Sequence, residues 1–66
     1  MKNKYDELLS LYINIVVSEQ IEENNNQLSD FQILQIKKST TTKIINMVND
    51  YGIDFTINFL EERINL

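Results

Sequence analysis

The sequence contains no histidine, cysteine, tryptophan, proline or alanine, and its one glycine is Gly52. Without thiols and imidazoles, the chain cannot form a disulfide, a thiolate or histidine metal site, or an imidazole acid–base catalyst. The groups left for chemistry are carboxylates, a few lysines, hydroxyls and tyrosines. We therefore expect a protein that is not an enzyme, holds no cofactor or metal, and functions by binding.

The short length of the chain limits the size of its hydrophobic core. Its 66 residues (1–66) form one small domain near the lower size limit for independent folding. A domain of this size buries only about 60% of its unfolded surface, whereas ordering it costs roughly 1.5 kcal/mol per residue. Small domains usually add disulfides, a metal or a second subunit. Because the first two need residues that are missing here, we expect self-association, with a homodimer as the simplest form.

Charge and hydropathy restrict the partners. A net charge of −4 disfavours nucleic acid and anionic membranes, which both attract positive surfaces. A hydrophobic content of 42% argues for a packed core. The apolar stretch 8–17 is interrupted by Ser10 and Asn14, lacks a small-residue cleavage site and is shorter than the roughly 20 residues of a membrane span. We expect a soluble, cytoplasmic protein without a membrane segment.

The first helix is predicted over residues 4–23. Its polar positions recur every four residues and line one stripe: Asp6, Ser10, Asn14, Ser18 and Glu22. The β-branched residues between them allow a strand as the alternative, but the polar repeat and the absence of a partner strand favour the helix. The remaining apolar arc is wider than two short neighbours can cover. We therefore predict a helix-to-helix interface on this surplus, at Leu11, Tyr12, Ile15 and Val16.

The second helix is predicted over residues 29–51 and is the longest. A polar loop at 24–27 precedes it, and Ser29 with Gln32 forms a capping-box pattern. Threonine has low helix propensity, so a kink or break near 39–42 is the alternative to one continuous helix.

The third helix is predicted over residues 54–65. Gly52 fits a left-handed position after the second helix, with Ile53 as the apolar residue of a Schellman turn. Asp54 then fits the N-cap of the third helix. The predicted fold is all-α, with three helices in one domain.

The basic residues Lys37, Lys38 and Lys43 are the only concentration of positive charge. They are candidates for contact with an anion or an acidic partner. The plainer interpretation is a solvated helix face that pairs with carboxylates of the first helix. Adjacent acidic residues point about 100° apart on a helix, so they too are expected to be solvated.

The function that these patterns favour is a small acidic regulator or inhibitor that docks on a larger protein. The scarcity of residues with GC-rich codons indicates an AT-rich genome, such as that of a low-GC bacterium, its phage or a mobile element. One alternative is a DNA-binding transcriptional regulator resembling a helix-turn-helix, disfavoured by Asn58, Glu61 and Glu62 on the would-be recognition helix. The other is a structural or assembly component that forms larger oligomers.

Overall fold

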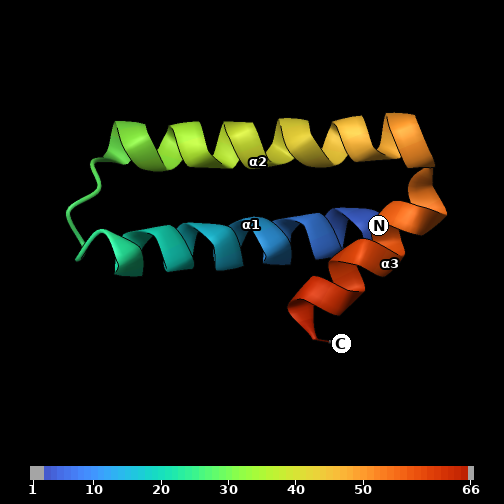
Figure 1. The fold of residues 1–66 in the computed structure, drawn as a ribbon, viewed down its shortest axis with the longest axis horizontal. Helices are drawn as coiled ribbons and strands as arrows, with labels where there is room; N and C mark the ends of the chain where they lie inside the picture. Colours follow the sequence, from blue (N-terminus) through green and yellow to red (C-terminus); the bar gives the residue numbers. More distant parts are fainter. Residues whose placement is uncertain (1–2, 66) are drawn as a thin grey trace.

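The computed structural model describes residues 3–65, which form three helices and no strand. Helix α1 spans Lys4–Glu23, α2 spans Asp30–Tyr51 and α3 spans Ile53–Ile64. Helices α1 and α2 run antiparallel as a hairpin, and α3 turns back from the end of α2 to pack against both (Figure 1). The predicted all-α, three-helix fold is confirmed, with the third helix starting and ending one residue earlier than predicted.

Asparagines set both ends of α1. The Asn3 side chain caps its start by accepting a hydrogen bond from the Asp6 N–H at 2.9 Å, a cap that was not among the predicted ones. The predicted polar loop follows α1, and within it Asn25 and Asn26 have positive φ values of 55° and 61°. Asparagine tolerates this left-handed conformation better than most residues. The asparagine run therefore reverses the chain without glycine.

The predicted capping box begins α2. The Gln32 N–H donates to Ser29 Oγ at 3.1 Å, and the Ser29 N–H donates to Gln32 Oε1 at 2.8 Å. The helix is continuous through residues 39–42, so the break considered there is absent; a bend of the axis stays a prediction. Within this stretch the Thr41 hydroxyl donates to the Lys37 carbonyl at 2.8 Å, which satisfies its polar group inside the helix.

The junction between α2 and α3 is a single residue, and here the predicted capping was wrong. Gly52 has φ 92° and ψ 166°, a region that essentially only glycine adopts and that differs from the left-handed helical one. Its N–H donates to the Val48 carbonyl at 2.8 Å, and its own carbonyl accepts from the Thr56 N–H at 3.3 Å. Gly52 thus ends one helix and caps the next, so Ile53 is the first residue of α3 and Asp54 lies in its first turn.

The core takes one side chain from each helix. Leu8, Ile44 and Leu60 are almost completely inaccessible and pack together. Partly buried apolar residues surround them: Tyr5, Leu9, Tyr12, Met47, Ile57, Phe59 and Ile64. Thr56 is also fully buried, and its hydroxyl donates to the Gly52 carbonyl at 2.9 Å. The core is small, because Val17 is the only other buried apolar side chain among residues 3–65.

Two further features are an ion pair between helices and the lengths and hydropathies of the helices. An ion pair joins Lys4 Nζ to Glu61 Oε2 at 2.8 Å, which links the start of α1 to the last turn of α3. None of the helices in the described part of the chain is long and apolar enough to cross a membrane.

Candidate functional site

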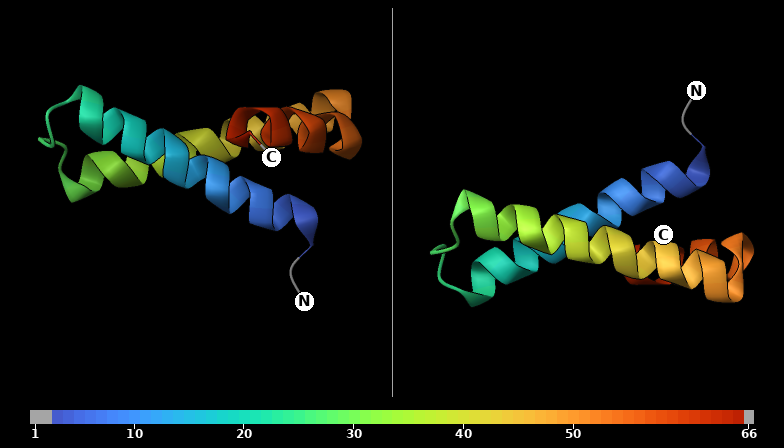
Figure 2. Two further views of the ribbon diagram at one scale, coloured as in Figure 1. Left: turned by 90° about the horizontal axis from the view of Figure 1, so that it is seen from below. Right: turned by 90° about the horizontal axis from the view of Figure 1, so that it is seen from above.

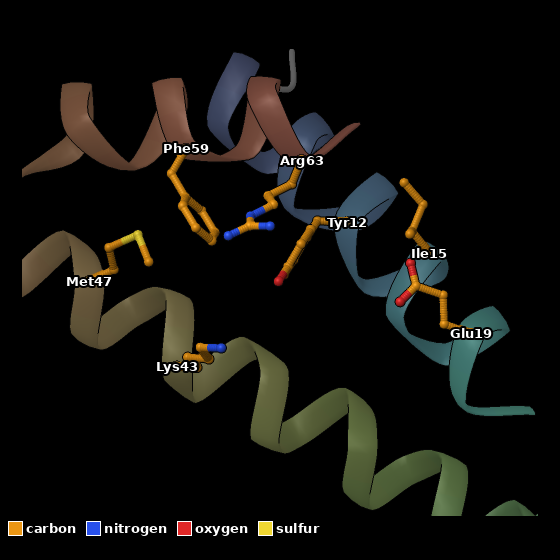
Figure 3. A pocket seen from close by; sticks show the side chains of 7 residues that line it. All are labelled: Tyr12, Ile15, Glu19, Lys43, Met47, Phe59 and Arg63. Carbon is orange, nitrogen blue, oxygen red and sulfur yellow. The ribbon is translucent and has the colours of Figure 1, made fainter. Parts of the chain in front are cut away.

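A cleft of about 460 Å³ lies where the three helices meet (Figure 3). Helix α1 contributes three of its lining residues, and α2 and α3 contribute two each. They are Tyr12, Ile15, Glu19, Lys43, Met47, Phe59 and Arg63. Two groups of residues singled out from the sequence therefore meet here, because two of the four α1 interface candidates lie beside one of the three lysines.

Two aromatic side chains and a cationic one, in contact with each other, form one wall of this cleft. The Tyr12 ring meets the Phe59 ring edge-on, with centroids 6.0 Å apart and an interplanar angle of 68°. The Arg63 guanidinium lies over the Phe59 ring, 5.2 Å from its centroid, and Figure 3 shows it between the two aromatic side chains. Edge-on aromatic pairs and cation–π contacts are both stabilising. This wall is therefore held in place by packing as well as by the backbone.

Lys43 and Arg63 bring positive charge to the cleft, and Glu19 brings a carboxylate. No ion pair among residues 3–65 joins Glu19 to either cation. The cleft can consequently accept an acidic or aromatic group of a ligand, with hydrogen bonds from the two cations.

The other sequence-predicted residues lie elsewhere. Lys37 and Lys38 are exposed on α2 and do not line the cleft. Lys43 follows Lys37 by six residues, which places it about 240° around the helix, so the lysines do not share one surface. Of the α1 interface candidates, Leu11 is 46% exposed, whereas Val16 is half-buried.

An aromatic pair that was not predicted from the sequence lies at the junction of α2 and α3. The Tyr51 and Phe55 rings contact each other with centroids 4.9 Å apart and planes tilted by 31°, and the side chains are 66% and 51% exposed. Ile53, between them in sequence, is 43% exposed. We call Tyr51, Ile53 and Phe55 the aromatic corner. Tyr51 is the last residue of α2 and Phe55 lies in the first turn of α3, and this junction projects beyond the first turn of α1 (Figure 1).

The titratable groups offer little chemistry of their own. No cluster of metal-ligating side chains occurs within residues 3–65. Burial raises the pKa of the Tyr5 phenol, and the neighbouring Asp6 carboxylate raises it further. Tyr5 packs against the core, away from the cleft. Comparison of the chain with protein-family models, with curated proteins and with solved structures gave no match.

Proposed function

We propose that this chain acts by binding protein, as a small regulator or inhibitor that docks on a larger partner. The observation that supports this is the placement of its apolar side chains. Among residues 3–65, seven large apolar side chains are exposed, whereas four are buried in the core. Phe31, Leu34 and Ile45 lie along α2, and Tyr51 at its end forms the aromatic corner with Ile53 and Phe55. Exposed apolar side chains that gather in this way are typical of interaction surfaces.

The aromatic corner is the proposed anchor for the partner. Its two rings already pack against each other, so binding would cost little further loss of rotamer freedom. Exposed aromatic residues frequently dominate the binding energy of interfaces. Beside them lies a hollow of about 280 Å³, lined by Phe55, Asn58, Phe59 and Glu62. This hollow offers a place for one apolar side chain of the partner.

The charges around the corner indicate the chemistry of that partner. Asp50, Asp54 and Glu62 are all exposed near the corner or its hollow. An apolar groove with a basic rim would complement this arrangement. The same carboxylates would repel DNA phosphates, and a single-residue junction is shorter than the usual turn of a helix-turn-helix. Protein binding is therefore favoured over the DNA-binding alternative, and it requires no catalytic residue or cofactor.

The test is quantitative affinity capture from cells with matched variants. Phe55→Glu places a charge in the corner, and Leu11→Glu places the same charge in the competing interface predicted on α1, at a similar exposure, 46% against 51%. Circular dichroism first establishes that both variants keep their helices. We expect Phe55→Glu to lose a protein that the unmodified chain and Leu11→Glu both retain. The proposal fails if the unmodified chain enriches no protein. If only Leu11→Glu loses the partner, the aromatic corner is not the anchor.

A further inference from the structure

A second apolar stripe follows α2 beside the one that packs into the core. Its members are spaced alternately by three and four residues, and we call them the outer seam: Phe31, Leu34, Lys38, Thr41, Ile45 and Val48. This alternation is the heptad spacing of helices that pack along each other in pairs. The core stripe, which contains Thr40 and Ile44, lies on a different side of the same helix.

Four of the six residues of the outer seam are exposed in the described chain: Phe31, Leu34, Lys38 and Ile45. Phe31 is 68% exposed, Leu34 and Ile45 are each 47% exposed, and Thr41 and Val48 are half-buried at its border. The right panel of Figure 2 looks down on α2, and neither of the other helices passes over it. The seam from Phe31 to Val48 is about 26 Å long at 1.5 Å per residue.

We propose that a second copy of the chain covers this seam, with the two α2 helices antiparallel. In this orientation the seam positions of one copy pair with those of the other around a twofold axis between residues 39 and 40. Leu34 then packs against the second copy's Ile45, and Phe31 against its Val48. The same register places Lys38 beside Thr41. All six seam residues therefore find a partner in one register.

The two polar seam residues select this orientation. In a parallel pair, Lys38 would face the same lysine of the other copy, and like charges placed together destabilise an interface. In the antiparallel pair it faces Thr41, whose hydroxyl already donates to the Lys37 carbonyl at 2.8 Å. Thr41 can therefore present its methyl group without leaving a buried hydroxyl unpaired. The Lys38 stem can lie along the seam while its ammonium reaches water.

Exposed area and charge both agree with this dimer. The chain exposes 4963 Å², several hundred square ångströms more than the roughly 4,400 Å² expected for a compact monomer of its mass. A surface larger than expected is consistent with a chain that buries part of it against a partner. Five carboxylates and one lysine give α1 a net charge of −4, whereas three lysines and two aspartates give α2 a net charge of +1. Contact through α2 therefore avoids pressing two acidic helices together.

The first test measures the mass of the purified protein by sedimentation equilibrium across a wide concentration range. We expect a monomer–dimer equilibrium, and we expect Ile45→Glu to raise the dimer dissociation constant at least about tenfold. Ile53→Glu is the matched control, because both isoleucines are helical and similarly exposed, at 47% and 43%. A monomer at every concentration overturns the proposal. So does a dimer that Ile53→Glu weakens and Ile45→Glu leaves intact.

The second test reads the orientation directly. The natural sequence has no cysteine, so Leu34→Cys and Ile45→Cys each add the only thiol, and both replacements are small. With a short bismaleimide linker, we expect the mixture of the two variants to cross-link and each variant alone to cross-link poorly. Strong cross-linking of each variant with itself overturns the antiparallel arrangement. Both tests use the purified chain alone. The dimer proposal can therefore fail while the proposed partner binding stands, and partner binding can fail while the dimer proposal stands.

Discussion

Replacing Ile44 with alanine should remove much of the stability of the fold. The side chain is fully buried between all three helices. Losing its extra carbon groups costs about 2–2.5 kcal/mol of transfer free energy at roughly 0.8 kcal/mol per methylene, and the cavity raises typical totals to about 2–5 kcal/mol. A domain of this length is stable by about 3–10 kcal/mol. Ile44→Ala should therefore be partly or largely unfolded, and the milder Ile44→Val should lose about 0.5–1.5 kcal/mol.

The adjacent residue provides the control. Ile45 has the same side chain in the same helix but is 47% exposed, so Ile45→Ala forfeits about half of the transfer term. The higher helix propensity of alanine returns roughly 0.4 kcal/mol, which leaves a net loss below about 1 kcal/mol. Urea unfolding followed by circular dichroism measures both variants, at a dilution where the chain is monomeric. Equal losses at the two positions would refute the placement of the core at Ile44.

Three further predictions test local features. Gly52→Ala and Gly52→Asn should each cost about 1–3 kcal/mol in thermal unfolding, since the glycine conformation excludes both replacements; tolerance of asparagine would indicate a left-handed helical position instead. Ser29→Ala should cost about 1 kcal/mol by removing the cap of α2, and an unchanged melting temperature would contradict the capping box. Because the folded-state pKa of Tyr5 is raised above 10.0, its contribution to stability is complete below the unfolded pKa and is lost as pH rises through the folded value. Stability measured against pH should therefore fall less in alkali for Tyr5→Phe than for the unmodified chain, and identical pH profiles would contradict the shift.

The features that could be predicted from the sequence are those determined by interactions between residues close together in the chain. Ser29 and Gln32 satisfy each other's backbone groups within one turn, so their pattern is sufficient to locate the start of α2. The asparagine run likewise marks the loop by itself. The conformation of Gly52 could be predicted only in part. A glycine after a helix indicates a positive φ, but its ψ of 166° depends on how α3 packs against the other helices. The single-residue junction therefore could not be read from local rules.

The site depended on contacts between distant segments, which periodicity does not supply. Tyr12 belongs to a wide apolar arc of α1. Nothing in the neighbouring sequence indicates that Tyr12 contacts Phe59 and is not exposed on the surface. Tyr51 continues the core stripe of α2 by spacing, yet it is 66% exposed. The spacing of residues predicts which of them share a helix face. Where along the helix that face is no longer covered by a neighbouring helix depends on the helix lengths and crossing angles.

The meeting of α1 with α3 has a consequence for the order of events during synthesis. Leu8 packs with Leu60, and Lys4 pairs with Glu61. These contacts of α1 can therefore form only after some fifty further residues have been synthesised. At about 5–20 residues per second, the delay is roughly 3–10 s. Throughout that interval the apolar arc of α1 has no α3 to cover it. The core around Leu8 and Leu60 therefore cannot close until synthesis has passed residue 60.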